Sequence, residues 1–582
     1  MTNTELKREH PKFSHPQSIV PGVSAGNILE SHEPHGVPMK DMWSHQKDHM
    51  QLVSPLNRRK FEVLVVGTGL SAGSAAAALG ELGYKVKVFT YHDSPRRAHS
   101  IAAQGGVNAS RAKKVDNDSA YRHTKDTVKG GDYRCRESDC WRLANESVRV
   151  IDHMNAIGAP FAREYGGTLA TRSFGGVQVS RTYYTRGQTG QQLQLSTTSA
   201  LYRQIGLGNV ELFAHNDLQD IIVYNDNGKK RAGGIVTRNL ITGELKAFTG
   251  HAVVLGTGGY GNVYHMSTLA KNSNASAMMR AYDSGAYLAS PAFVQFHPTG
   301  LPVNSDWQSK TILMSESLRN DGRIWSPKKE GDDRDPNTIP EEERDYFLER
   351  RYPAFGNLVP RDVASRAISQ QINAGLGVGP LHNSVYLDFR DAIERLGKDK
   401  IRERYSNLIE MYEEAIGESA YETPMRIAPT CHFTMGGLWT DFNEMTSIDG
   451  LFAAGESPGP TTGLTVWVQI PCFRLPSMAG SPCRLPSRTT WLITSTRRSW
   501  RRIPQRHRQP WHSPRSASIA SWECAVRTRT VRLTTTASWA ISSTTAAVCP
   551  VTSKTSRPPS PRSASCARTS GLMSASRVRP TT

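Results

Sequence analysis

Cysteines and long apolar runs are scarce in the first 456 residues of this 582-residue chain. Only Cys135, Cys140 and Cys431 of the eight cysteines lie there, which is too few for a disulfide framework or for iron–sulfur clusters. No stretch reaches the ~18–20 apolar residues that a membrane span needs. A charged-then-apolar signal peptide is not found at the start either. These absences favour a protein of a reducing compartment that would reach a membrane only through a partner.

Acidic residues are almost missing from the last part of the chain. Residues 457–582 carry nineteen of the 71 Lys and Arg residues but a single acid, Glu523. The formal net charge of +19 therefore belongs to this tail, and residues 1–456 are nearly neutral. The body of the protein thus lacks the excess positive charge that is typical of nucleic-acid binding.

A glycine-rich turn near residue 67 predicts a dinucleotide site. Residues 61–66 are an apolar, β-branched run of strand length, followed by Gly67-Thr68-Gly69-Leu70-Ser71-Ala72-Gly73 and an alanine-rich stretch. Small residues permit a tight turn, and the helix after it points N–H groups at a pyrophosphate. We therefore predict contacts to a dinucleotide from Gly67, Gly69 and Ala72. The alternative is a plain structural turn.

The residues after this turn favour FAD over NAD. After the expected strand at 86–90, Thr90-Tyr91 stand where an NAD site would place an acid for the ribose. Residues 251–255 form a second apolar strand that ends in glycines, among them Gly258 and Gly259. Two such strand–glycine units are typical of flavoproteins with two dinucleotide-binding folds. Between them, 217–223 and 233–238 alternate like antiparallel strands around a turn at 225–228.

A histidine among small residues lies some thirty positions after the glycine turn. The segment reads His99-Ser100-Ile101-Ala102-Ala103-Gln104-Gly105-Gly106. It resembles the flavin-attachment segment of the flavoprotein subunit of succinate dehydrogenase and fumarate reductase. The resemblance implies FAD bound covalently through His99, with Ser100, Gln104, Gly105 and Gly106 against the cofactor. Taken alone, a single histidine would more often be a surface or core residue.

Further motifs resemble the substrate site of the same family, in the same order. They are Gln295-Phe296-His297-Pro298-Thr299-Gly300, Ser315-Glu316 with Arg319, Val359-Pro360-Arg361-Asp362 and Thr430-Cys431-His432-Phe433. The resemblance implies that His297, Ser315 and His432 bind the substrate. It further implies that Arg361 exchanges a proton through Glu316 and Arg319, although an arginine is normally always protonated.

Two of these motifs also have a simpler interpretation. Arg361-Asp362 would also fit a salt-bridged helix start. Cys431 beside His432 could suggest a metal, but no second pair of ligands exists, so no metal site is expected. Cationic and hydrogen-bonding groups at both ends of a closed site are what a dicarboxylate requires.

The expected fold class is α/β with an α+β cap, an FAD-binding two-dinucleotide-fold flavoprotein with an inserted capping domain. We expect a polar N-terminal arm at 1–55, an FAD-binding domain at 56–290, a capping and substrate domain at 291–420, and a return to the FAD-binding domain at 421–456. The cap is expected to hold helices at 391–404 and 405–416. The returning strand leads to Glu456, which is predicted to hold the ribose.

The remaining segment, 457–582, is predicted to be an aberrant basic tail of low order. The family continues here with His-Gly-Ala-Asn-Arg-Leu-Gly, whose arginine grips a substrate carboxylate, whereas this chain reads Ser457-Pro458-Gly459-Pro460. Codons can be chosen for 465–472 so that the neighbouring frame reads Arg-Leu-Gly-Ser-Asn-Ser-Leu-Leu. We interpret the tail as out-of-frame translation that replaces a C-terminal helical domain. The alternative is a natural disordered basic tail.

The resemblance implies a succinate dehydrogenase flavoprotein subunit that oxidises succinate to fumarate and transfers a hydride to FAD. Electrons would pass to an iron–sulfur protein subunit and on to quinone, with a membrane cytochrome b anchor holding the complex at the cytoplasmic face of the cell membrane. No nucleic-acid partner is expected. Alternatives are the fumarate reductase direction, and a soluble relative such as L-aspartate oxidase, which lacks the covalent tether. Two others are an inactive chain that has lost the substrate arginine, and a non-catalytic product whose basic tail binds nucleic acid, which salt-dependent DNA binding would reveal.

Overall fold

The computed structural model describes residues 29–50, 53–111, 117–131, 133–174, 177–303 and 311–459. All of them belong to one compact unit. The predicted basic tail from Pro460 onward and the first 28 residues of the predicted arm lie outside the described residues.

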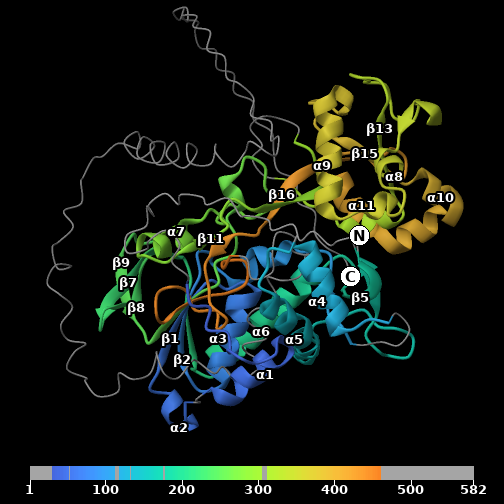
Figure 1. Ribbon diagram of the computed structural model, residues 1–582. Helices are drawn as coiled ribbons and strands as arrows, with labels where there is room; N and C mark the ends of the chain where they lie inside the picture. Colours follow the sequence, from blue (N-terminus) through green and yellow to red (C-terminus); the bar gives the residue numbers. More distant parts are fainter. Residues whose placement is uncertain are drawn as a thin grey trace, which may run out of the picture. The chain divides into compact units, whose positions relative to one another are not determined.

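A five-stranded parallel sheet carries the glycine-rich turns (Figure 1). Its strands are β18 (Leu451–Ala453), β10 (Ala252–Leu255), β1 (Glu62–Val66), β2 (Lys85–Phe89) and β6 (Val210–Phe213), in that order across the sheet. Every neighbouring pair is parallel, and Val63 lies opposite Ala252. The central strands are apolar because helices and a second sheet cover both faces. The two strand–glycine units noted in the sequence thus lie side by side in one sheet.

Helices from distant parts of the chain cover one face of this sheet. Helix α3 (Leu70–Glu81) follows β1 and packs against α6 (Thr189–Gly206). The helices α4 (Ala120–Gly130) and α5 (Glu137–Ala156) pack against each other beside them (Figure 1). Because Ala72 and Gly73 are small, the first turn of α3 lies close to the end of β10, where a Cβ added to Gly256 would come within 2.6 Å of the Ala72 Cβ.

Antiparallel strands cover the other face. The three-stranded sheet contains β7 (Asn216–Asp226), β8 (Lys229–Asn239) and β9 (Leu245–Thr249). Asn227 and Gly228 both have positive φ, 54° and 86°, as a two-residue hairpin turn requires. The hairpin predicted from the sequence is confirmed, with strands longer than expected. The remaining short elements are β3 (Val107–Asn108), β4 (Thr171–Phe174), β5 (Val177–Tyr183), β11 (Leu288–Ala289), β17 (Gly437–Leu438), and α7 (Ser276–Asp283).

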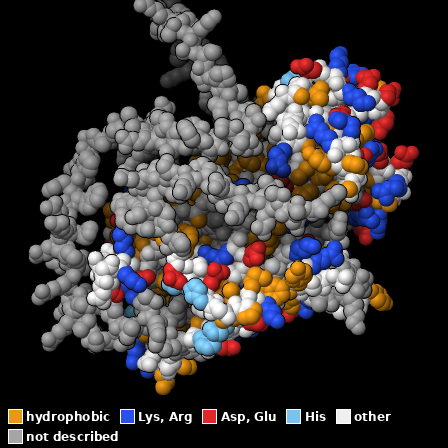
Figure 2. Space-filling view, viewed as in Figure 1, with side chains coloured by type: hydrophobic (Ala, Val, Ile, Leu, Met, Phe, Trp, Pro, Cys, Tyr) orange, Lys and Arg blue, Asp and Glu red, His pale blue; other side chains and the backbone are white. Residues whose placement is uncertain are grey.

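A second, antiparallel sheet begins where the cap was expected. Its order is β12 (Val294–Gly300), β16 (Met425–Thr434), β15 (Val385–Asp388), β13 (Arg323–Pro327) and β14 (Arg344–Asp345). Around it lie α8 (Phe347–Arg351), α9 (Arg361–Gln371), α10 (Arg390–Leu396) and α11 (Lys398–Ile416). These elements share a core of their own. Figure 2 shows acidic and basic side chains interspersed over the surface of this part.

The predicted boundary between the two cap helices is wrong. Gly397 separates α10 from α11 with φ 85° and ψ 147°, a conformation that no helix contains. The helix then continues through Arg404 and Tyr405 without a break. Ile401, Tyr405, Leu408 and Tyr412 are buried on one face of α11, so a single apolar stripe runs across the point where a break was predicted.

The sequence did not predict two helices near the start of the described chain, α1 (Met39–His49) in the N-terminal arm and α2 (Pro55–Arg58) at its boundary with the FAD-binding domain. Helix α1 has no fully buried residue but packs against α5. The segment before it is bonded to the loop that precedes β18. Phe442 donates its N–H to the Ser31 carbonyl at 2.8 Å, and His32 Nδ1 lies 2.9 Å from Asp441 Oδ2.

Ordered packing also continues three residues past the predicted start of the tail. Ser457 is buried, and its hydroxyl accepts a hydrogen bond from the Thr257 N–H at 2.9 Å. The Ser457 carbonyl accepts the Leu438 N–H at 3.0 Å. The chain therefore remains anchored to the sheet until Gly459.

Candidate functional site

A cavity of about 790 Å³ opens at the carboxyl ends of β1, β2 and β10. The predicted residues that line it are Gly67, Gly69, His99, Ser100, Gln104, Gly258, Gly259, His432 and Glu456. Leu408 and Met411 of α11 line it from the cap side. One cavity thus joins the dinucleotide turn, the predicted flavin segment and one of the predicted substrate histidines.

The glycine turn presents backbone groups to this cavity. Gly67 has φ 109°, which a side chain would strain, and Gly69 is the N-cap of α3 without any side-chain cap. The Leu70 N–H donates to Ser100 Oγ at 3.2 Å. Ala72 lies beneath the turn, where a Cβ on Gly256 would come within 2.6 Å of the Ala72 Cβ. The helix N-terminus therefore offers the partial positive charge and N–H groups that suit a phosphate.

The His99 ring is fixed in the cavity wall. Its Nδ1 accepts a hydrogen bond from the Ala270 N–H at 3.2 Å, across 171 positions of sequence. The backbone of the next residues is held as well, since the Gly190 N–H donates to the Ala103 carbonyl at 2.6 Å. The predicted flavin segment is thus bound from both sides by distant parts of the chain.

Gly105 and Gly106 support this segment from behind. The Gly105 carbonyl accepts hydrogen bonds from the Arg172 guanidinium at 3.0 Å and the Thr189 hydroxyl at 3.1 Å. Gly106 is packed so tightly that an added Cβ would lie 2.6 Å from the Tyr183 carbonyl oxygen. Gly105 and Gly106 lie behind the residues that line the cavity, so they affect its shape only through the backbone.

Glu456 enters the cavity from the loop after β18. Its side chain is buried beside Gly259, and Oε1 accepts hydrogen bonds from the Thr434 N–H at 2.9 Å and the Thr434 hydroxyl at 3.2 Å. Burial raises the pKa of this carboxyl to about 8, even though these donors act in the opposite direction.

Three buried charged residues lie together in the cap, on the short helix Glu316–Asn320 and at the start of α9. Glu316 accepts Arg361 Nε at 2.6 Å through Oε2 and Arg319 Nη1 at 2.7 Å through Oε1. The other nitrogens of Arg319 donate to the carbonyls of Asn357 at 2.7 Å and Val359 at 2.6 Å. Burial lowers the pKa of Arg319, and Glu316 opposes that effect. The structure brings the three predicted relay residues into one hydrogen-bonded chain.

The two predicted substrate histidines lie side by side next to these three charged residues. The rings of His297 and His432 meet edge to face at 5.0 Å, and His297 Nε2 is 4.0 Å from Glu316 Oε2. Burial, followed by the charge of Arg361, lowers the pKa of both histidines well below the usual value. Since Nδ1 of His297 accepts the Thr299 N–H at 3.3 Å, its neutral ring carries the proton on Nε2.

Ser315 occupies the end of the short 3₁₀ helix that carries Glu316 and Arg319 (Glu316–Asn320). Its hydroxyl is bonded to the Ser317 hydroxyl at 2.8 Å and caps that helix. Ser315 is therefore the N-cap of the helix that carries Glu316 and Arg319.

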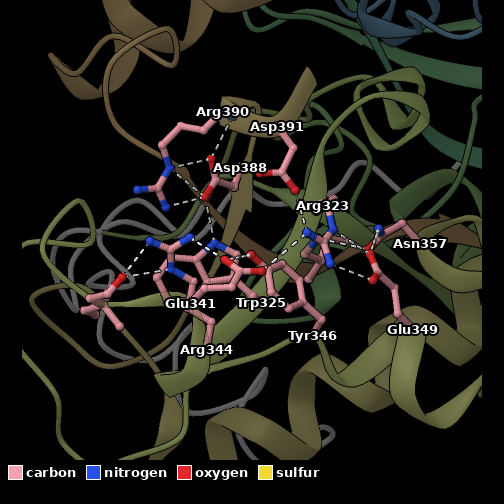
Figure 3. Close-up of polar contacts among 12 residues, drawn as sticks. Arg323, Trp325, Glu341, Arg344, Tyr346, Glu349, Asn357, Asp388, Arg390 and Asp391 are labelled. Carbon is pink, nitrogen blue, oxygen red and sulfur yellow. Dashed lines mark hydrogen bonds and ion pairs between the residues drawn. The ribbon is translucent and has the colours of Figure 1, made fainter. Parts of the chain in front are cut away.

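Several partners of the charged cluster were not predicted as site residues. Gln295 accepts Arg361 Nη1 at 3.0 Å, and the Thr268 hydroxyl lies 2.8 Å from His432 Nδ1. Asn357 donates from its side chain to Glu349 at 2.8 Å, beside the surface ion pairs of Arg323 (Figure 3). Because the Asn357 carbonyl accepts a hydrogen bond from Arg319, these ion pairs are connected to the buried cluster. Gln295 is two residues from His297 on the same strand, so strand alternation was a usable signal. Thr268 and Asn357 carried no signal because their contacts are non-local.

Neither a metal site nor a membrane span is found in the part of the chain that the structure describes. Among these residues, no group of three or more His, Cys, Asp or Glu side chains is placed to hold a metal ion. Within the same residues, no helix has both the length and the apolar character required to cross a bilayer.

Comparison with known proteins identifies the family. A model of the FAD binding domain matches residues 62–464. The succinate dehydrogenase flavoprotein subunit of Bacillus subtilis is 36% identical over 396 residues, which are 68% of this chain and 63% of that protein. This chain thus spans less than two thirds of that relative.

Solved structures agree. The quinol fumarate reductase of E. coli superimposes with a TM-score of 0.61 at 29% identity, over 73% of this chain and 69% of that one. A quinol-fumarate reductase with menaquinol gives a TM-score of 0.64 at 28% identity, over 75% and 73%. The chain therefore belongs to the FAD-binding-domain family, together with the flavoprotein subunits of succinate dehydrogenase and fumarate reductase.

Proposed function

We propose that the described body is that of a flavoprotein subunit that interconverts succinate and fumarate, in the direction of succinate oxidation. The observation that carries this proposal is the buried cluster Arg361–Glu316–Arg319 beside His297 and His432, of which His432 also lines the cavity. Two arginines with one carboxylate leave a net positive charge that suits a dicarboxylate. The alternative direction, fumarate reduction, uses the same residues.

The cavity fits FAD by the character of its lining. Gly67, Gly69 and the N-terminus of α3 would hold the pyrophosphate, and Gly258, Gly259 and Glu456 would lie along the rest of the cofactor. Bound FAD would supply the acceptor for a hydride. His297 and His432, both neutral, would orient a substrate carboxylate by hydrogen bonding. Arg361 would exchange the proton, and Glu316 with Arg319 would carry it onward.

We further propose a covalent bond from His99 to FAD. Nδ1 of His99 is engaged by the Ala270 N–H, so Nε2 is the nitrogen that would form the bond. Denaturing the purified chain and measuring flavin that stays with the protein tests this. Flavin released in full would favour a relative without the tether, such as an L-aspartate oxidase.

Partners and location belong to the same proposal. Reduced flavin must pass electrons onward, which we assign to an iron–sulfur subunit and a membrane cytochrome b anchor at the cytoplasmic face of the cell membrane. We retain the division into an FAD-binding part, 56–290 and 421–456, and a cap at 291–420. For 457–582 we propose out-of-frame translation, and an intact reading frame in the gene would contradict it.

Succinate-dependent dye reduction tests the function. We expect little or no turnover from the chain as it stands, because the family's substrate arginine is replaced, and robust turnover would contradict our interpretation of the tail. The same gene with its frame restored should oxidise succinate. In that product Arg361→Gln should lower the rate by about 10²–10⁴-fold. Arg366→Gln, a neighbour on α9 whose side chain is 64% exposed, is the matched control and should leave the rate unchanged.

A restored product that binds FAD yet neither oxidises succinate nor reduces fumarate would refute the proposed function. Loss of activity in both arginine variants would instead indicate general damage to α9. FAD absorbance of each variant therefore has to be recorded alongside the rate.

A further inference from the structure

Glu456 is an unusual group for the wall of a cofactor cavity. It is only 9% exposed, it lines the cavity, and within the described residues it makes no ion pair with a lysine, arginine or histidine. A buried carboxylate without a counter-charge is costly, and such groups tend to take up a proton instead.

The neighbours of Glu456 carry no charge that could balance it. On β16 the pKa of Cys431 is raised to about 12 by burial, and the pKa of His432 is lowered well below its usual value, so both are neutral near pH 7. In the loop after β10, burial raises the pKa of Tyr260, which keeps its hydroxyl neutral too. Thr434 and the Gly259 N–H complete the surroundings as uncharged hydrogen-bond donors.

Hydrogen bonds explain where the proton sits. Oε1 already accepts the N–H and the hydroxyl of Thr434, so this oxygen acts as the carbonyl of the acid. The remaining oxygen, Oε2, is then the one that carries the proton. With a pKa of about 8, the side chain is mostly protonated at pH 7.

We infer that Glu456 meets FAD as a neutral carboxylic acid that donates a hydrogen bond to the cofactor, and that loss of its proton weakens FAD binding. The inference rests on the binding of FAD to this cavity. A carboxylate would repel the pyrophosphate charge in the same cavity and could only accept hydrogen bonds. A neutral carboxylic acid does not repel the pyrophosphate and can donate a hydrogen bond.

FAD titration of the full chain tests the inference. Apoprotein from riboflavin-starved cells is titrated with FAD, and flavin fluorescence is read before any covalent bond forms. The affinity should be about tenfold lower at pH 9 than at pH 7, because the protonated fraction falls by that factor around a pKa of about 8. Glu456→Gln, which can donate at every pH, should bind FAD with no such decline.

A second variant checks the assigned cause. Thr434→Val removes the hydroxyl donor that favours the ionised carboxyl, so the decline in FAD affinity should move to higher pH. A general loss of fold would instead weaken binding equally at all pH values, and thermal unfolding of each variant separates the two.

Infrared spectroscopy reads the proton without FAD. At pH 7 ordinary carboxyl groups are ionised, so the difference spectrum between the parent chain and Glu456→Gln should contain the C=O band of one protonated carboxyl, lost by about pH 10. Absence of this band, or an equal pH decline in Glu456→Gln, would overturn the inference. A parent chain that shows the band but binds no FAD at any pH would overturn both the donor role and FAD binding, while leaving the protonation state established.

Discussion

The flavin cavity and the charged cluster are built on opposite principles. The cavity is lined by glycines and other small residues at the dinucleotide turn and by larger side chains such as Leu408 and Met411 on the cap side, with a carboxyl that holds its proton. The cluster places the charges of Arg361, Glu316 and Arg319 inside the protein, where Glu316 is bonded to both arginines. The cavity should therefore be sensitive to atoms that are added, and the cluster to a charge that is removed.

Removing the central charge should have the largest effect. Glu316→Ala leaves two buried arginines without their partner, and we expect a loss of about 3–5 kcal/mol in unfolding free energy, measured with urea. Glu349→Ala breaks the ion pair with Arg323, where both side chains are about a third exposed, and should cost only about 1 kcal/mol. Equal losses in the two variants would contradict the importance of burial.

Replacing Glu456 by a neutral side chain should instead stabilise the folded protein. Its pKa in the folded protein is raised to about 8 from 4.5, so the folded state holds a proton that the unfolded chain has lost. Stability therefore falls as pH rises from 4.5 to 8, at about 1.4 kcal/mol per unit at most. Glu456→Gln should unfold at a higher temperature than the parent at pH 8, with the advantage shrinking towards pH 5. A constant difference would contradict the linkage.

An added methyl group should break the cavity wall. Gly256→Ala would bring its Cβ within 2.6 Å of the Ala72 Cβ, so α3 must move away from β10. We expect a loss of about 1–3 kcal/mol and weaker FAD binding. Gly206→Ala at the end of α6, where an added Cβ meets no atom within 4 Å, is the control and should be neutral or slightly stabilising. FAD fluorescence and thermal unfolding report the two effects.

The ion pair between His32 and Asp441 should have the smallest effect on the free energy of unfolding. The hydrogen bond to Asp441 raises the pKa of His32, so its contribution is full below pH 6.5 and is lost as pH rises through the raised value. The His32 side chain is 52% exposed, so we expect less than about 1 kcal/mol. His32→Asn tolerates the φ of 54° and should match the parent above pH 8 but unfold earlier at pH 5.

Local patterns predicted the parts of the fold that local chemistry determines. The apolar run before Gly67 specified a buried strand, and the Asn227-Gly228 pair specified the hairpin turn. The helix predicted over 391–404 runs through Gly397, whose φ of 85° breaks it, so the division between the cap helices was placed at the wrong point. Helix α1 was missed because it buries no residue fully and its contacts lie on α5, about a hundred positions away.

For the site, the sequence predicted which residues take part, but it did not predict their hydrogen-bond partners or their charge states. Family resemblance selected Arg361, Glu316 and Arg319, but the carbonyls that hold Arg319 belong to a segment some forty positions away. The raised pKa of Glu456 depends on burial among uncharged neighbours from three segments, which no motif encodes. Sequence therefore names candidates, while charge state and support arise from packing.

The bond from the Thr257 N–H to the Ser457 hydroxyl spans 200 positions of the chain and has a consequence for biosynthesis. Four strands of the parallel sheet can pair once residue 255 has left the ribosome, whereas the wall formed by β16 and Glu456 does not yet exist. Translation at ~5–20 residues per second needs roughly 10–40 s for that interval. During this interval the glycine turn of the nascent chain stays open to solvent. FAD can be enclosed only after the last described residues have been synthesised.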